Sequence, residues 1–211
     1  MIWVFDAYGT LFDVDGAARE AARTDPSLTG VWPALSFDWR RKQLEYSWMR
    51  LATGEHADFW QVTSDALDWA AERHGVTDTR RLLDLYRRLP AYPEVPAVLT
   101  ALKARGQTAI FSNGSPQMLA DAVGSAGITL DALLSVETAG RFKPAAEAYR
   151  VVTDHFGTYP AGITFVSSNG WDIYGAAAFG FATAWVNRGG LPVDRLPHRP
   201  GRILSDLTGL L

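Results

Sequence analysis

The sequence contains no cysteine, which removes disulfides, thiolate metal ligands and cysteine nucleophiles from consideration. It also has no excess of positive charge: 20 basic residues stand against 23 acidic ones, and both are spread along the chain. Nucleic-acid binding requires a basic stripe, so nucleic acid is not an expected partner. The few histidines are scattered without the spacing of metal ligands. They are His56, His74, His155 and His198.

Long hydrophobic runs are also missing. The apolar stretch at residues 2–5 ends at Asp6, and no basic leader precedes it. A membrane-spanning helix requires roughly 20 apolar residues, and a secretion signal combines a basic segment with an apolar one. We therefore expect no export, no membrane partner and a cytoplasmic location. With 211 residues and 47% hydrophobic content, the chain can nevertheless bury a sizeable core.

Short runs of β-forming residues alternate with helical patterns near residues 93–105, 115–126, 144–156 and 171–179. This alternation predicts an α/β fold with a Rossmann-like parallel sheet and helices on both faces. The expected strands are residues 2–5, 108–111, 132–135, 163–166 and 182–186. The C-terminal residues are loosely patterned and predict no further element.

Residues 15–89 interrupt this alternation with amphipathic helical patterns, among them Leu44, Trp48 and Leu51, and contain no convincing strand. We predict two domains: residues 1–14 and 90–211 form the core, and residues 15–89 form an inserted helical cap. The segments at residues 14–16 and 89–90 are candidate hinges for closure of the cap.

Polar clusters follow several of the predicted strands, at the sheet edge where parallel sheets bind ligands. Asp6 follows the first strand, and Lys143 lies in the loop after the third. Asp6 could act as a nucleophile or cap its own turn through backbone N–H groups. Lys143 could keep that carboxylate ionised or be an ordinary surface lysine. Pro144 is expected in the first turn of the next helix.

Polar residues at the other strand ends, and two arginines in the helical insertion, also permit both a functional and a purely structural interpretation. Residues 112–116 could bind an anion at a helix N-terminus, or Ser115 could simply cap that helix before Pro116. Asp172 could activate water or only stabilise the dipole of its helix. Arg40 and Arg41, on a cap helix, could each clamp a halide or carboxylate, or pair with Glu45 on a solvated face.

These motifs resemble the haloacid dehalogenase superfamily and, more narrowly, the L-2-haloacid dehalogenases. The resemblance runs from Ile2 to about Arg188. It rests on Asp6-Ala7-Tyr8-Gly9-Thr10-Leu11, Ser112-Asn113-Gly114-Ser115, Lys143-Pro144 and Ser167-Ser168-Asn169-Gly170-Trp171-Asp172, in this order, with a helical insertion after the first motif.

The resemblance implies that the protein converts short L-2-haloacids to D-2-hydroxy acids through an ester on the nucleophile Asp6. Arg40 matches the arginine that receives the halide, whereas Arg41 stands where glutamine is common in that family. The resemblance also implies a homodimer. The other implied catalytic residues are Thr10, Ser112, Lys143, Tyr149, Ser167, Asn169 and Asp172. The implied substrate-binding residues are Tyr8, Arg40, Leu44, Phe59, Ser112, Asn113 and Trp171.

Most members of the superfamily are phosphatases that hold magnesium and carry a second aspartate two positions after the nucleophile. Here Tyr8 occupies that position, and Ser168 stands where a metal ligand is expected. A halide leaves without a proton, so no general acid is needed, and we expect neither metal nor cofactor. The alternatives are a small-molecule phosphatase and a binding module with a decayed site.

Overall fold

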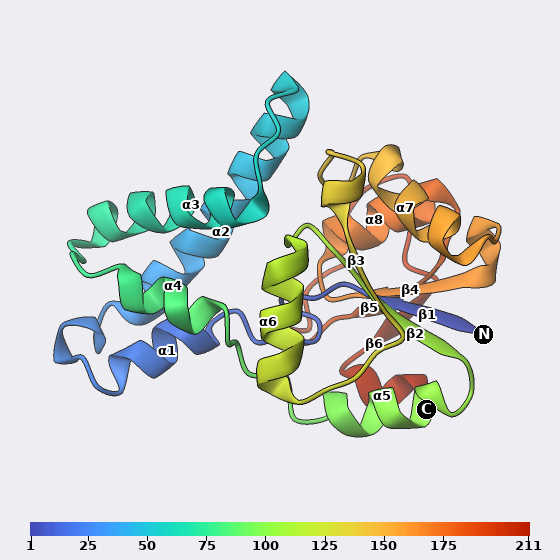
Figure 1. The fold of residues 1–211 in the computed structure, drawn as a ribbon, viewed down its shortest axis with the longest axis horizontal. Helices are drawn as coiled ribbons and strands as arrows, with labels where there is room; N and C mark the ends of the chain where they lie inside the picture. The colour runs from blue at the N-terminus through green and yellow to red at the C-terminus, as the bar shows by residue number, and fades with distance from the viewer.

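A computed structural model describes residues 1–211 of the protein (Figure 1). Its sheet contains six parallel strands in the order β3-β2-β1-β4-β5-β6. The strands are β1 (Ile2–Phe5), β2 (Gln107–Ser112), β3 (Ala132–Ser135), β4 (Ile163–Ser167), β5 (Ala182–Val186) and β6 (Arg202–Leu204). The predicted α/β fold class is therefore confirmed, and β6 is an additional strand at the C-terminal end that the sequence pattern missed.

Helices cover both faces of the sheet, because the helices that follow β2, β3 and β4 bury their apolar sides against it. In Figure 1, α7 and α8 lie above the strands and α5 lies below them. These helices are α5 (Val95–Lys103), α6 (Pro116–Ala126), α7 (Ala146–Phe156) and α8 (Gly170–Phe179). Pro144 does not open α7 as predicted: Ala145 is extended, with φ of -62° and ψ of 140°, so the helix begins only at Ala146.

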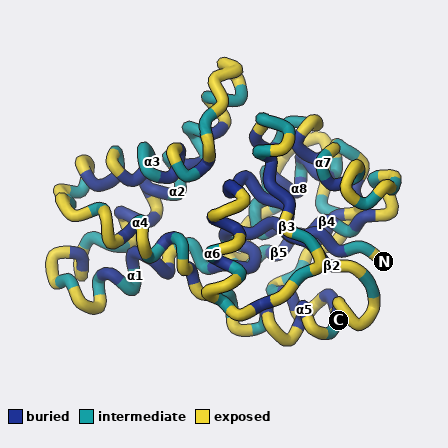
Figure 2. Tube along the Cα trace, viewed as in Figure 1, coloured by how far each residue is buried: buried dark blue, intermediate teal, exposed yellow.

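Residues 16–86 form a separate group of helices beside the sheet (Figure 1). The helices are α1 (Gly16–Ala22), α2 (Trp32–Thr53), α3 (Phe59–His74) and α4 (Arg80–Tyr86), and no strand occurs among them. In α2 the buried side carries Leu35, Trp39 and Gln43, whereas Leu44 and Trp48 remain partly open to solvent. Figure 2 shows this division, with buried segments where α2 faces α3 and exposed segments outside.

Two chain segments connect this helical group to the sheet, and they run side by side. The backbone N–H of Asp13 donates to the carbonyl of Pro90, and the N–H of Tyr92 donates to the carbonyl of Leu11. Gly16 is required here, because a Cβ atom at this position would lie 2.6 Å from Pro90 Cδ. None of the helices combines the length and apolar character needed to cross a bilayer.

Candidate active site

Asp6 directly follows the carboxyl end of β1, which is a central strand of the sheet. Phe5 pairs with Ile110 on one side and Val166 on the other, so Asp6 emerges between the ends of β2 and β4. Its backbone N–H donates to the carbonyl of Val166. Asp6 as a whole is only 5% exposed. The register of the central strands therefore positions one carboxylate where the polar clusters meet.

The Asp6 carboxylate accepts hydrogen bonds from side chains only. Oδ2 accepts from Thr10 Oγ1 at 3.0 Å, from Asn169 Nδ2 at 2.8 Å and from Ser167 Oγ at 3.5 Å. Oδ1 accepts from Lys143 Nζ at 3.2 Å. The alternative in which Asp6 caps its own turn through backbone N–H groups is thus wrong. A carboxylate held by converging donors is the arrangement expected of an oriented nucleophile.

Lys143 is fully buried, so the alternative of an ordinary surface lysine is also wrong. Besides Asp6, its Nζ donates to the carbonyl of Phe111 at 2.7 Å and to Oδ2 of Asp172 at 3.0 Å. Its backbone N–H donates to Asn113 Oδ1 at 2.9 Å. All three ammonium protons therefore have acceptors, and the positive charge lies between two carboxylates.

Asp172 lies in the first turn of α8 and has no exposed surface. Burial raises the pKa of its carboxyl from 3.8 to about 6, and the Lys143 ammonium opposes this rise. The Tyr149 hydroxyl donates to Oδ1 at 2.7 Å. Burial also raises the pKa of Tyr149 well above 10, so the phenol keeps its proton and remains a donor. The pKa of Asp172 thus lies closer to neutral pH than that of an ordinary carboxyl.

Two residues at helix N-cap positions do not cap their helices. Asn169 precedes α8, but its side chain donates to Asp6 and to the carbonyl of Tyr8. Ser115 precedes α6 and makes no capping hydrogen bond, so the capping alternative for Ser115 is wrong. Asn169 forgoes a cap that typically contributes about 1 kcal/mol and instead holds the candidate nucleophile.

The loop after β2 is held close to the ring of Tyr8. Ser112 Oγ accepts from the backbone N–H of Gly114 at 3.0 Å, and Ser135 Oγ donates to the Gly114 carbonyl at 2.7 Å. A Cβ atom at Gly114 would lie 2.8 Å from the Tyr8 ring, so glycine is required for this approach. Ser112 therefore orders this loop from within, whereas Asn113 joins it to the segment that carries Lys143 by accepting from the Lys143 backbone N–H.

Thr10 is fixed by two contacts that the sequence motifs did not indicate. Its Oγ1 accepts from the backbone N–H of Ser168 at 2.8 Å. Its carbonyl accepts from Arg188 Nη2 at 3.0 Å, and the Arg188 guanidinium lies 3.7 Å from the centre of the Tyr92 ring. Arg188 therefore joins the Asp6 loop to the segment that returns from the helical group. No local pattern marks Arg188, because the residues that it contacts are distant in sequence.

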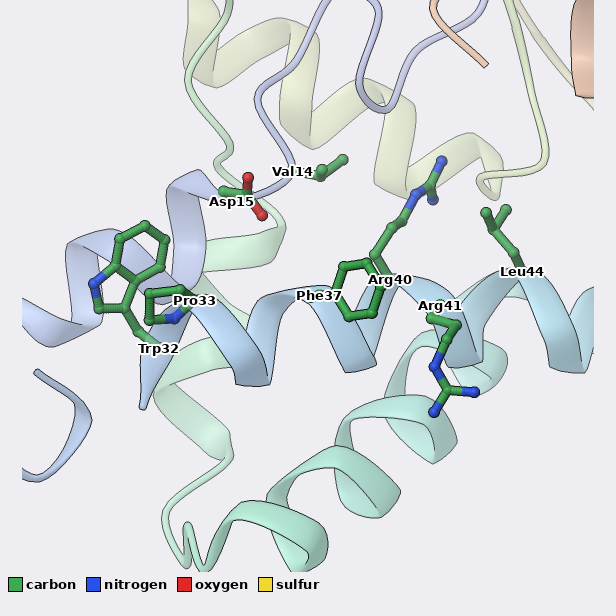
Figure 3. Close-up of a pocket in the computed structure, with 8 residues that line it drawn as sticks. All are labelled: Val14, Asp15, Trp32, Pro33, Phe37, Arg40, Arg41 and Leu44. Atoms are coloured by element: carbon green, nitrogen blue, oxygen red, sulfur yellow. The ribbon is translucent and has the colours of Figure 1, made fainter. Parts of the chain in front are cut away.

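On the helical side, Arg40 and not Arg41 points toward the sheet. Figure 3 shows Arg40 and Leu44 on the side of α2 that faces Val14, whereas Arg41 points to the other side. Arg40 Nη2 donates to the carbonyl of Tyr8 at 3.3 Å. Arg41 pairs instead with Asp38 and Glu45, so it adopts the predicted solvated alternative.

Arg40 also lines a groove of about 590 Å³. The groove is lined by Val14, Asp15, Trp32, Pro33, Phe37, Arg40, Arg41 and Leu44.

The aromatic residues predicted to line a substrate pocket each pack against a different aromatic ring. Tyr8 stacks on Tyr86, with ring centres 5.5 Å apart. Trp171 meets Trp48 of α2 edge to face at 5.5 Å. Phe59 is buried against Phe142, which precedes Lys143, and among the predicted lining residues only Arg40 and Leu44 lie in the groove. The substrate-binding set thus stays a prediction.

Two of the four histidines pair with carboxylates. His56 lies 2.8 Å from Glu137, and His74 lies 2.9 Å from Asp38. No group of three histidine, cysteine, aspartate or glutamate side chains converges as a metal-binding cluster.

Comparison with known proteins places the chain in a family. A family model described as haloacid dehalogenase-like hydrolase matches residues 2–180. The (S)-2-haloacid dehalogenase 1 of Pseudomonas sp. (strain CBS-3) is 47% identical, over 88% of this chain and 83% of the relative. The (S)-2-haloacid dehalogenase 4A of Burkholderia cepacia is 42% identical, over 99% of this chain and 93% of the relative.

A solved structure shows the same relationship. The L-2-haloacid dehalogenase of Xanthobacter autotrophicus with chloropropionic acid covalently bound superposes with a TM-score of 0.87 and 36% identity. The match covers 99% of this chain and 96% of that one. The chain therefore belongs to the haloacid dehalogenase-like hydrolase family and, within it, to the group of the (S)-2-haloacid dehalogenases.

Proposed function

We propose that this protein hydrolyses short (S)-2-haloacids, which are L-2-haloalkanoic acids, to D-2-hydroxy acids through an ester on Asp6. The observation that carries the proposal is the buried Asp6 carboxylate, held by Lys143 on one oxygen and by Thr10 and Asn169 on the other. This arrangement orients a carboxylate as a nucleophile. The relatives are named (S)-2-haloacid dehalogenases, which supports this substrate class and the loss of halide.

In the first step, an Asp6 oxygen attacks C2 of the substrate from the face opposite the halogen. The new O–C2 bond forms as the carbon–halogen bond breaks, and the halide leaves with the bonding electrons. Arg40 and Asn113 receive the halide. Arg40 lies beside the Tyr8 carbonyl, at the helical side of the Asp6 loop, and its guanidinium is suited to a departing anion.

In the second step, water attacks the carbonyl carbon of the ester on Asp6. Asp172 accepts a proton from that water, and its raised pKa suits a base that works near neutral pH. The bond between the Asp6 carbonyl carbon and the ester oxygen then breaks, and the leaving alkoxide takes the proton held by Asp172. Asp6 releases its remaining proton to solvent, so the hydroxy acid leaves and both carboxylates are restored. Because this step leaves C2 untouched, the reaction inverts C2 once and converts an L-substrate to a D-product.

The remaining predicted residues support these two steps. Tyr149 orients Asp172 through its hydroxyl, and Ser167 lies within 3.5 Å of Asp6. Ser112 and Asn113 order the loop that would receive the substrate carboxylate. Lys143 places a positive charge between Asp6 and Asp172, so these two carboxylates need no metal ion to offset their charge. We therefore propose that no metal or cofactor takes part.

The proposal extends to the domains. Residues 15–89 act as a cap over the core formed by residues 1–14 and 90–211, and the two connecting segments are its hinges. The groove beside Arg40 and Leu44 is the route by which the substrate enters. Tyr8, Phe59 and Trp171 contact the alkyl part of the substrate when the cap closes.

We also propose a homodimer in the cytoplasm. Phe37 on α2 is 68% exposed and, with Trp32 and Pro33, forms an apolar surface at the part of the groove nearest the start of α2, away from Leu44. An exposed apolar patch of this kind favours association with another copy. Analytical ultracentrifugation of the protein and of Phe37→Glu tests this assignment: the protein is expected to sediment as a dimer and the variant as a monomer.

The experiment that tests the activity is chloride release from L- and D-2-chloropropionate in the presence of a metal chelator. Release from the L-form only, with loss of release in Asp6→Asn, is the expected result. If no chloride is released and added magnesium elicits phosphate release from an aryl phosphate, the protein is a phosphatase instead. Binding of haloacid without any turnover would identify a binding module.

A further inference from the structure

The interior of the helical cap contains a buried polar side chain that the reaction described above does not use. Gln43 lies on α2 and is fully buried against α3. A buried amide is unfavourable unless its donors and its acceptor find partners. Gln43 finds partners on both sides, and these partners determine which way the amide points.

The orientation of the Gln43 amide follows from the hydroxyl of Thr63. Thr63 Oγ1 donates its one proton to the carbonyl of Phe59 at 2.7 Å, so it can only accept from Gln43. The donor is therefore Gln43 Nε2, at 2.9 Å. The amide oxygen must then face the opposite way, toward Arg40 and Tyr86.

The amide oxygen of Gln43 accepts from Tyr86 and from Arg40. The Tyr86 hydroxyl donates at 3.2 Å and Arg40 Nη1 donates at 3.4 Å. Burial raises the pKa of Tyr86, so its phenol stays protonated and remains a donor. The other arm of the guanidinium, Nη2, donates to the carbonyl of Tyr8. Arg40 is thus held by one acceptor in the cap interior and one in the Asp6 loop.

We propose that Gln43 is a positioning residue for Arg40, and that Thr63 fixes the orientation of Gln43. The inference deepens the proposed function, because it rests on Arg40 as the group that receives the halide. Without the Gln43 oxygen the guanidinium loses its amide acceptor in the cap interior and can rotate away from the leaving group. Neither Gln43 nor Thr63 touches the substrate, since both are enclosed within the cap.

The test compares four variants. Gln43→Met keeps the length of the side chain but removes the acceptor, and Thr63→Val removes the hydroxyl at nearly constant shape. Thr63→Ser retains the hydroxyl and serves as the conservative rescue. Trp39→Phe is the matched structural control. It removes the indole N–H that donates to the Thr63 carbonyl at 2.9 Å, but it keeps an aromatic ring beside Tyr86 and leaves the hydrogen-bonding groups of Gln43 and Thr63 in place.

The informative readout is the ratio of kcat for L-2-bromopropionate to kcat for L-2-chloropropionate, measured beside Tm. Chloride is the poorer leaving group, so loss of a positioned Arg40 slows chloride release more. Gln43→Met and Thr63→Val are expected to lower kcat for the chloro substrate by roughly ten- to a hundredfold and to raise the ratio. Thr63→Ser should keep both kcat for the chloro substrate and the ratio close to those of the unaltered protein. Trp39→Phe should lower Tm without changing the ratio.

An unchanged ratio in Gln43→Met, or an equal change in Trp39→Phe, would overturn the inference. A crystal structure of Gln43→Met provides a readout that does not depend on activity. Displacement of Arg40 from the Tyr8 carbonyl is expected, and an unmoved Arg40 refutes the positioning role. If the unaltered protein releases no halide, the proposed function fails, and this structural result still decides whether Gln43 positions Arg40.

Discussion

The Nζ atom of Lys143 lies 3.2 Å from Oδ1 of Asp6, and both side chains are almost completely withdrawn from solvent. The same Nζ lies 3.0 Å from Oδ2 of Asp172. One buried ammonium therefore serves two buried carboxylates. Removing one partner from such a group leaves charges without compensation, which destabilises a fold far more than loss of an exposed pair does.

Replacing Lys143 with methionine should impair both activity and stability. We expect kcat/KM to fall by at least about a hundredfold and the free energy of unfolding to fall by about 3 to 5 kcal/mol. Halide release and urea unfolding measure the two effects. The control is Lys103→Met, which removes a 42% exposed lysine paired with Asp131 and should leave both quantities nearly unchanged. Full activity in Lys143→Met would refute its assigned role.

The raised pKa of Asp172 predicts opposite pH dependences for stability and activity. Between about pH 4 and about pH 6 the folded protein keeps a proton on Asp172 that the unfolded chain has lost. Over this range the folded state binds more protons, so this group makes stability fall as the pH rises, with no further change above about 6. Activity needs the ionised base, so kcat should instead rise through about pH 6.

Asp172→Asn tests this pH dependence. The variant should lose the contribution of Asp172 to the fall in stability between about pH 4 and about pH 6, as measured by urea unfolding at several pH values. It should also lose activity at every pH. Asp68→Asn removes an exposed carboxyl and is expected to behave like the unaltered protein. A stability profile in Asp172→Asn identical to that of the unaltered protein would contradict the assignment.

Gly175 in α8 leaves room for the side chain that orients Asp172. A Cβ atom at Gly175 would lie 2.5 Å from the Tyr149 hydroxyl oxygen and 2.7 Å from Pro144 Cβ. Gly175→Ala should therefore displace Tyr149, lower kcat by about tenfold or more and destabilise the protein by about 1 to 3 kcal/mol. Halide-release kinetics and thermal unfolding would show both changes.

Gly124 offers the matched control for Gly175. It also lies inside a helix, but a Cβ atom there would meet nothing within 4 Å. Gly124→Ala should stabilise the protein by about 0.5 to 1 kcal/mol, because alanine favours the helix more than glycine does. If both alanine variants behaved alike, the contact with Tyr149 would not be the cause.

Trp48 of α2 makes an edge-to-face contact with Trp171 in the first turn of α8, so this pair joins the proposed cap to the core. Trp48→Ala should weaken closure of the cap over the substrate and raise KM by about two- to tenfold, with little effect on Tm. Steady-state kinetics with L-2-chloropropionate measure the change. Met49→Ala alters the neighbouring, 61% exposed residue and should leave KM as it is. An equal rise in both variants would mean that the Trp48–Trp171 contact does not govern closure.

Local patterns in the sequence predicted most of the fold. The run Ile2–Phe5 and the four later apolar runs all form parallel strands, because buried strands leave continuous apolar segments. The strand Arg202–Leu204 left no such signal, since it lies at the sheet edge and Ile203 is 52% exposed. Its existence depends on pairing with β5, and that pairing is a tertiary contact.

The residues of the site also fall into those that local sequence patterns predicted and those that they did not. Asp6, Lys143 and Asp172 belong to motifs at predicted strand ends, and the fold brings them within hydrogen-bond distance. No motif predicted a role for Arg188 or Gln43. Their relevance follows only from contacts between segments that are distant in sequence, namely Arg188 with Thr10 and Gln43 with Thr63.

The most direct test of the account is a single turnover of L-2-chloropropionate in oxygen-18 water, with enzyme in excess. If Asp6 forms an ester that water attacks at its carbonyl carbon, mass spectrometry of the peptide containing Asp6 will show the label in that carboxylate, and the first product molecule will carry none. Label in the first product molecule, with Asp6 unlabelled, would mean that water attacks C2 directly and would contradict the role of Asp6 as nucleophile.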